Sequence, residues 1–256
     1  MLLLSTYSLK GYGIHRIFQI GKKSNYDGLD LYMDLKEYDL WDVDYIKDIK
    51  EKSGINVYSI TVPSKGLTKV KIEKIFEIAD ALKVQLVTFS PPHIGDKSKT
   101  WFTKYLQEIK NNFNFNIAIQ NIETKYILFI IPEYRNIPLN ELKNITGFSS
   151  LDIANIDNSS AIDIIKATKI LGTSMKNVFF SDKRGDEYGL LPGKEISGIS
   201  NLPLESFLMN LKANAYNGFI TLKVDPMELG VGDEEEVLKN LEKIKKYYTK
   251  YYIDFK

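Results

Sequence analysis

The sequence predicts a single (β/α)8 TIM barrel over residues 1–256. Short apolar runs rich in β-branched and aromatic residues alternate with longer segments of helical periodicity. Most of the eight apolar runs start roughly thirty residues apart, which is the length of one strand–helix unit. No linker interrupts this alternation. Strict alternation over such a length is typical of one closed parallel barrel.

Each predicted strand is a run of five or six residues in which apolar or β-branched side chains recur. The eight strands are expected at Leu2–Thr6, Gly28–Tyr32, Ile55–Ile60, Gln85–Phe89, Asn116–Gln120, Ser149–Ile153, Asn177–Ser181 and Phe219–Val224.

Helical periodicity marks the segments between these strands, because their apolar residues recur every three or four positions. In one segment, Val70–Leu82, one stripe is formed, as a helix that covers a sheet requires, by the apolar residues Ile72, Ile75, Phe76, Ile78, Ala79 and Leu82. The clearest predicted helices are Val43–Lys52, Val70–Leu82, Thr100–Asn111, Ser160–Leu171, Leu204–Ala215 and Glu234–Tyr248.

An open, doubly wound sheet is the structural alternative to the barrel. It would need fewer strand–helix units and a Gly-rich turn after the first strand. Gly11-Tyr12-Gly13 comes near such a turn, but the third glycine and the acidic residue of a dinucleotide site are missing. The sequence therefore favours an ordinary turn here.

Two connections are irregular. Ile122–Pro138 contains the apolar run Tyr126–Ile131, which could form a hairpin, a lid or an oligomer contact, and a loop packed over the barrel rim is favoured over a specific partner site. Asp182–Pro203 is rich in Gly and Pro, and barrel loops of this length are usually functional or partly mobile.

Composition excludes several functional classes. A net charge of +1 gives no overall field for nucleic acid or membrane, and the absence of Cys excludes disulfides, thiolate metal sites and Cys nucleophiles. The apolar start Leu2–Leu4 is too short for a signal-peptide core, and no later stretch could span a bilayer, so a cytoplasmic protein is expected. Walker, Gly-x-Ser-x-Gly and His-Glu-x-x-His motifs are absent.

The C-terminal ends of the strands carry the most information about function, because they surround the active site of a barrel. The second strand reads Tyr26-Asp27-Gly28-Leu29-Asp30-Leu31, and the fifth ends Ile119-Gln120-Asn121. The sixth reads Leu151-Asp152-Ile153-Ala154-Asn155. The seventh reads Val178-Phe179-Phe180-Ser181-Asp182, and the eighth ends at Lys223.

This series resembles the xylose-isomerase-like TIM-barrel superfamily. That group includes sugar and sugar-phosphate isomerases and epimerases, an inosose dehydratase, and abasic-site nucleases of the endonuclease IV type. The resemblance implies a divalent metal held by Glu on the fifth strand, Asp and His on the sixth, His and Asp on the seventh, and Glu on the eighth. The nuclease branch adds His on the third and fourth strands.

The present chain departs from that ligand pattern. Asp152 and Asp182 match it, and Asn121 matches the Asn that follows the Glu of the fifth strand in the family. The remaining positions do not, because the family's Glu and His ligands are replaced here by Gln120, Asn155, Phe179 and Lys223, and the nuclease His positions by Thr61 and Ser90. A phenyl ring offers no ligand and an ammonium repels a cation, so no bound metal and no other cofactor is expected.

Lys223 and Asp152 are the predicted catalytic residues. Lys223 could simply pair with Asp152 across the mouth, which is the favoured interpretation. It could also bind a substrate hydroxyl or anion, or act as a base or Schiff-base amine. Predicted substrate-binding residues are Gln120, Asn121, Asn155, Asp182, Lys183 and Arg184.

The basic pair Lys183–Arg184 lies where barrels often bind phosphate, although a solvated turn is the favoured alternative. Pro192-Gly193-Lys194 partly matches a turn that lies near the substrate in the family.

The predicted function is that of a diverged sugar or sugar-phosphate isomerase or epimerase that works without the family's metal. The alternative is a non-catalytic barrel that binds a sugar or phosphate or serves regulation. An abasic-site endonuclease is a third hypothesis, which the neutral net charge and the missing histidines disfavour. The expected partner is a small sugar or sugar phosphate, with no nucleic acid and no membrane. A homodimer through Tyr126–Ile131 is a further expectation.

Overall fold

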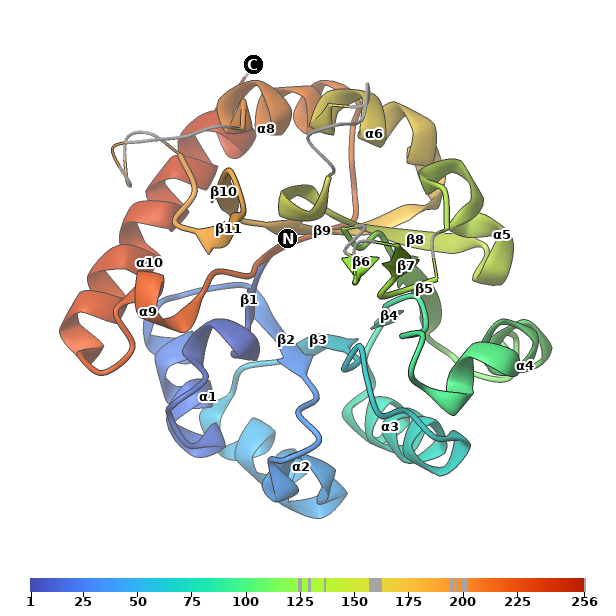
Figure 1. Ribbon diagram of the computed structural model, residues 1–256. Coiled ribbons are helices and arrows are strands. Elements are labelled where there is room, and N and C mark those ends of the chain that lie inside the picture. Colours follow the sequence, from blue (N-terminus) through green and yellow to red (C-terminus); the bar gives the residue numbers. More distant parts are fainter. Residues whose placement is uncertain are drawn as a thin grey trace.

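Eight parallel strands close into a barrel in the order β1-β12-β9-β8-β5-β4-β3-β2, and helices surround it (Figure 1). This computed structural model describes the residues 1–123, 126–128, 130–135, 137–156, 163–193, 196, 198 and 202–255. The barrel closes where β1 pairs with β12, with Leu2 beside Ile220. The predicted (β/α)8 architecture is therefore confirmed.

All eight predicted strands are present, with ends that differ by no more than two residues. They are β1 (Leu2–Ser5), β2 (Gly28–Tyr32), β3 (Val57–Thr61), β4 (Leu86–Phe89), β5 (Asn116–Gln120), β8 (Phe148–Asp152), β9 (Met175–Phe180) and β12 (Phe219–Leu222).

The six predicted helices are also found among the described residues. They are α2 (Val43–Ser53), α3 (Lys69–Leu82), α4 (Phe102–Ile109), α6 (Ile164–Leu171), α8 (Leu204–Ala213) and α10 (Glu234–Tyr248). The structure adds helices that were not among the predicted ones: α1 (Ile14–Lys23), α5 (Lys143–Thr146) and α9 (Pro226–Leu229). Every apolar residue of the predicted α3 stripe is buried. The first residues of the predicted helix Ser160–Leu171 lie outside the described part of the chain. None of the described helices is long and apolar enough to cross a membrane.

Local sequence explains where these helices begin and end. Asp42, before α2, accepts a hydrogen bond from the backbone of Tyr45, and Asp163 does the same for Lys166 before α6. Gly54 ends α2 at φ 67°, a left-handed conformation that suits glycine. Helix α4 begins two residues later than predicted, because Lys97–Thr100 form a separate 3-10 turn.

Two antiparallel hairpins interrupt the strand–helix alternation, and both project over the barrel opening in Figure 1. The first, β6 (Tyr126–Ile127) with β7 (Ile131–Pro132), confirms the hairpin among the alternatives for this segment. The second hairpin consists of β10 (Asp182–Arg184) and β11 (Glu187–Leu190). It forms the first part of Asp182–Pro203, which was expected to be an irregular loop.

Inward-facing side chains form layers along the barrel axis. Near the start of the strands lies a small apolar cluster of Leu3, Leu86, Ala118 and Phe219. Alternation along a strand turns every second side chain inward. Two positions further along the same strands the buried side chains are polar: Ser5, Thr88, Gln120 and Thr221. The barrel interior thus changes from apolar to polar toward the mouth.

Close packing at the start of β2 gives a test of the barrel wall. A Cβ atom on Gly28 would lie 2.4 Å from the ring of Tyr58 and 2.8 Å from the carbonyl oxygen of Asn56. We expect Gly28→Ala to lower the free energy of unfolding by about 1–3 kcal/mol, measured by urea denaturation. Gly13→Ala is the matched control, because a Cβ there meets nothing within 4 Å. Equal stability of the two variants would contradict this packing.

Candidate active site at the mouth of the barrel

The four predicted strand tips do meet at the mouth of the barrel. Asp152 ends β8 and lies beside Phe179 of β9 in the strand register. The ammonium of Lys223, just after β12, lies 3.1 Å from Asp152 Oδ2 and 4.8 Å from the centre of the Phe179 ring. Gln120 ends the neighbouring strand β5. The structure therefore brings Lys223 and Asp152 together as an ion pair.

This ion pair is largely removed from solvent. The side chain of Asp152 is 6% exposed and that of Lys223 19% exposed. Burial alone would lower the pKa of Lys223, but the adjacent Asp152 carboxylate outweighs it, and the net effect raises that pKa. Lys223 is therefore an ammonium at neutral pH. The face of the Phe179 ring supplies a second favourable contact for its charge.

Gln120 presents an unused hydrogen-bond acceptor. Its Nε2 donates to Ser90 Oγ at 2.6 Å. Its Oε1 is buried and has no hydrogen-bond partner among the described residues. A buried carbonyl oxygen without a donor is costly, so this atom is suited to a donor from a ligand.

Asn121 holds the backbone of Asp152 in place. Its Nδ2 donates to the Asp152 carbonyl at 2.9 Å, and its Oδ1 accepts from the Asp152 amide at 2.7 Å. Asn121 is thus a positioning residue for Asp152. A contact between Asn121 and substrate stays a prediction. So does one for Asn155, which is half-buried in the 3-10 turn η5 (Ile153–Asn155) that follows Asp152.

The segment Asp182-Lys183-Arg184 is strand β10, and the solvated turn favoured from the sequence is wrong for its first two residues. Asp182 and Lys183 are buried, 1% and 3% exposed. Asp182 Oδ1 accepts from the amides of Lys183 and Leu202, at 2.8 Å and 3.3 Å. The Lys183 ammonium donates to the Ile156 carbonyl. These residues therefore anchor the hairpin.

Arg184 alone remains exposed in β10. Its guanidinium binds the Glu187 carboxylate through Nε at 2.8 Å and Nη2 at 2.5 Å. This contact closes the hairpin across its own turn. Roles in substrate binding for Arg184, Lys183 and Asp182 stay predictions. Lys194, of the expected Pro-Gly-Lys turn, lies outside the described residues.

The β10–β11 hairpin is fixed to both sides of the mouth. The Gly189 carbonyl accepts from the Asp225 amide at 2.7 Å, two residues after Lys223. A Cβ on Gly189 would lie 2.9 Å from that amide nitrogen, and its φ is 74°, so only glycine fits easily. The neighbouring Tyr188 hydroxyl donates to the Glu123 carboxylate, after β5. The hairpin therefore lies beside the ion pair as part of the site wall.

Sequence reasoning assigned no role to Asp30, a carboxylate buried inside the barrel. It is 0% exposed and accepts hydrogen bonds from the hydroxyls of Ser5, Ser59 and Thr61, at 2.8–2.9 Å. Burial raises the pKa of Asp30, although the three hydroxyls and Lys223 oppose that shift. The available signal was an acidic residue inside an otherwise apolar strand.

The side chains at the mouth do not fit a divalent cation. Among the described residues, no three or more His, Cys, Asp or Glu side chains are grouped so that they could hold a metal ion. At the four tips, the single carboxylate already has an ammonium 3.1 Å away. A divalent ion would have to displace that ammonium and accept an amide as its next ligand. Whether the protein carries a metal stays a prediction.

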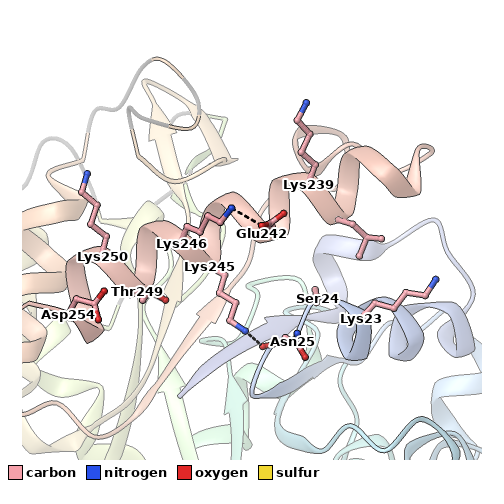
Figure 2. Close-up of a pocket in the computed structure, with 11 residues that line it drawn as sticks. Lys23, Ser24, Asn25, Lys239, Glu242, Lys245, Lys246, Thr249, Lys250 and Asp254 are labelled. Atoms are coloured by element: carbon pink, nitrogen blue, oxygen red, sulfur yellow. Dashed lines mark hydrogen bonds and ion pairs between the residues drawn. The ribbon is translucent and has the colours of Figure 1, made fainter.

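A separate groove of about 710 Å³ lies at the opposite end of the barrel, between the end of α1 and α10 (Figure 2). Lysines dominate its lining, but Figure 2 shows Lys245 reaching to Asn25 and Lys246 to Glu242. Residues at this end of a barrel usually contribute to stability and not to catalysis. The mouth is therefore the better candidate site.

Breaking the buried ion pair tests how the mouth is held together. Lys223→Met would leave the Asp152 carboxylate buried without its cation, and we expect a loss of about 3 kcal/mol in the free energy of unfolding. Lys246→Met is the control, since it breaks the exposed Lys246–Glu242 pair and should change stability little. Comparable losses from both variants, in urea denaturation, would contradict a buried pair.

The same pair predicts a pH dependence. Because folding raises the pKa of Lys223, its stabilisation is present below the pKa of an unfolded lysine, about 10.4, and is lost as the pH rises through the folded value. The stability difference between the wild-type protein and Lys223→Met should therefore be constant near neutral pH and shrink above about pH 10.5. A stability difference that is smaller near pH 7 than above about pH 10.5 would mean that folding lowers the pKa of Lys223, and this would contradict the ion pair.

Comparison with known proteins gives structural matches only. No protein-family model matches the sequence, and no curated protein matches it. The IOLI protein, solved with a zinc atom, superposes with a TM-score of 0.72 at 14% identity, over 98% of this chain and 99% of that one. An AP endonuclease, family 2, from Brucella melitensis gives 0.71 at 11% identity, over 96% and 98%.

A sugar epimerase gives a similar match. The D-allulose 3-epimerase from Methylomonas sp., in complex with D-allulose, superposes with a TM-score of 0.70 at 14% identity, over 98% of this chain and 96% of that one. Identities this low establish a shared fold. Together with the closed eight-stranded parallel barrel, they show that this chain has the fold of the xylose-isomerase-like TIM barrels.

Proposed function

We propose that this protein is a diverged sugar or sugar-phosphate isomerase or epimerase that works at the barrel mouth without a divalent metal. The observation that carries the proposal is the Lys223–Asp152 pair, with its 3.1 Å contact at the strand ends where barrel enzymes place their chemistry. The sugar epimerases among the structural neighbours support the reaction class. Fold alone does not determine function, so the argument rests on this pair.

The pair contains the two groups that such a reaction requires. Isomerisation or epimerisation beside a carbonyl removes a proton from carbon and returns it. For an isomerisation, the Asp152 carboxylate would take that proton and give it to the neighbouring carbon of the enediol; an epimerisation would need a second acid to return the proton to the opposite face of the same carbon. The Lys223 ammonium would face the carbonyl oxygen and stabilise the negative charge that develops on it, which is the task of a metal in other enzymes.

The protonation state of Lys223 favours this electrostatic role over covalent catalysis. A Schiff base requires a neutral amine. The raised pKa of Lys223, caused by the Asp152 carboxylate acting against burial, leaves little neutral amine near pH 7. Lys223 is therefore better suited to hold charge than to attack a carbonyl carbon.

A non-catalytic sugar-binding or regulatory barrel is the second candidate, and one observation favours it. The Lys223 ammonium already has two partners inside the protein, the Asp152 carboxylate and the face of the fully buried Phe179 ring. A pair that satisfies itself in this way could stabilise the mouth without taking part in a reaction.

An abasic-site endonuclease receives less support from the site. The positions of two family histidines are Thr61 and Ser90, and both hydroxyls are engaged within the barrel. Thr61 donates to Asp30 at 2.9 Å, and Ser90 accepts from Gln120 at 2.6 Å. Neither offers a ligand comparable to imidazole.

The expected homodimer also stays a prediction, as does the cytoplasmic location. The β6–β7 hairpin exposes several large apolar side chains, which is a feature of interaction surfaces. They are Tyr126, Ile127, Leu128, Ile130 and Ile131.

Proton exchange in deuterated water tests the proposed reaction directly. The purified protein, treated with EDTA, is incubated with a panel of ketoses and aldoses and followed by proton NMR. We expect exchange at the carbon beside the carbonyl of at least one sugar. Asp152→Asn and Lys223→Met should each lower its rate by about 100-fold or more, because each removes one of the two reacting groups. Lys246→Met is the control for nonspecific effects.

The outcomes separate the candidates. Exchange that appears only after Mn or Zn is added would refute the metal-free mechanism. Sugar binding that survives in both mouth variants, with no exchange in the wild-type protein, would instead support the non-catalytic barrel.

A further inference from the structure

We infer that the groove between α1 and α10 is a second binding site, which takes a small polyanion that carries several phosphate groups (Figure 2). None of the residues that line this groove belongs to the mouth, so such a site is independent of the proposed reaction. Three features of the groove support it: an excess of positive charge, lysines whose charge is incompletely neutralised, and a lining that suits a ligand held by charge.

The first feature is the charge of the lining. Lysines outnumber carboxylates there by five to two. The carboxylates are those of Glu242 and Asp254, and the lysines are Lys23, Lys239, Lys245, Lys246 and Lys250. The whole chain has a net charge of only +1. Positive charge is therefore concentrated in this groove, and a local field of this kind attracts anions.

The ends of the adjacent helices do not cancel this excess. Helix α1 ends at the groove, and so does α10 together with the π-helical turn η7 (Thr249–Ile253) that continues it. The C-terminal end of a helix carries a partial charge of about −0.5, so two such ends contribute roughly −1. Against five lysines and two carboxylates, this contribution still leaves the groove positive.

The second feature is the set of partners that these lysines have. The Lys245 ammonium donates to the Asn25 carbonyl, which is a neutral acceptor and leaves the charge in place. Lys23 binds the Glu234 carboxylate at 3.0 Å, but Arg16 binds the same carboxylate, so one negative charge serves two cations. Lys239 is exposed, and Figure 2 shows its side chain extending away from α10. An added anion would therefore meet cations that are not fully neutralised.

The third feature is the size and character of the groove. Its volume of about 710 Å³ is typical of a small-molecule site. Leu238 is the one large apolar residue in the lining, which contains no aromatic side chain. Single-stranded nucleic acid is usually held by stacking on aromatic rings, and protein partners by buried aromatic or aliphatic anchors. A compact ligand with phosphate oxygens, which accept from lysine ammonium groups, fits this lining better.

Such a ligand would connect the first and last strand–helix units of the barrel. The present contacts between them are few and polar. The Tyr26 hydroxyl donates to the Leu241 carbonyl at 3.3 Å, and Lys245 reaches Asn25. A polyanion that contacts Lys23 together with the lysines of α10 would add an ionic link between these units. Because it binds the folded chain, it would also stabilise it by mass action.

Inorganic tripolyphosphate is the probe that tests this site. It is titrated into the full chain by isothermal calorimetry, without added metal. We expect saturable binding whose affinity falls about tenfold or more between about 50 mM and about 500 mM NaCl, because salt screens exposed charges. At roughly ten times its Kd, tripolyphosphate should raise Tm by about 3–6 °C.

Two pairs of variants locate the binding in the groove. Lys239→Gln should weaken it about threefold to fivefold, whereas Lys104→Gln, on α4 outside the groove, should leave it unchanged. Glu242→Gln removes a carboxylate from the lining and releases Lys246, so binding should tighten about threefold. Glu108→Gln, which removes the partner of Lys104, is its control, because it changes the net charge equally.

The opposite results would overturn the proposed site. Absence of saturable binding at about 50 mM NaCl would show that the lysines are merely solvated. Equal effects of the groove variants and their controls would place the binding elsewhere. ATP should bind no more tightly than tripolyphosphate, since the lining has no ring on which a base could stack. Tighter binding of ATP, of a single-stranded oligonucleotide or of a polyglutamate peptide would contradict a ligand recognised by its phosphates alone.

Discussion

The contact between the buried Asp152 carboxylate and a cation organises the rest of the site. The cation is the ammonium of Lys223, 3.1 Å away. Asn121 fixes the backbone of Asp152 with two hydrogen bonds, and the Phe179 ring covers the ammonium. Removing one partner of a buried ion pair costs far more free energy than forming the pair gains. The contacts of Asn121 and Phe179 therefore help to keep Asp152 and Lys223 together.

The barrel itself was predictable because parallel strands buried on both faces stand out as apolar runs between amphipathic helices. The α3 stripe illustrates this, since every apolar residue in it is buried as expected. The β10–β11 hairpin was not predictable in the same way. Its residues are mostly polar, and its anchors, the Asp225 amide and the Glu123 carboxylate, lie far away in sequence. Tertiary contacts, and not local propensity, create that hairpin.

The candidate site was predictable in its members and less so in their roles. Gln120, Asp152 and Lys223 could be placed together because parallel strands end at one edge. The partner of each depends on the lateral register of neighbouring strands, which one sequence does not contain. The register determines that Gln120 donates a hydrogen bond to Ser90 and that the side-chain amide of Asn121 donates one to the Asp152 carbonyl. The buried hydroxyl cluster around Asp30 was missed for the same reason.

The two buried carboxylates, Asp30 and Asp152, differ in the groups that satisfy them. Asp30 is satisfied by three hydroxyl dipoles, has a pKa that burial raises, and is 0% exposed. Its donors come from the barrel wall and cannot leave. Asp152 is satisfied by one flexible ammonium whose side chain is 19% exposed. A lysine side chain can move aside when a hydroxyl arrives, whereas a wall of strands cannot. In the proposed function, Asp152 is therefore the carboxylate that exchanges its partner for a ligand, whereas Asp30 keeps its hydroxyl donors.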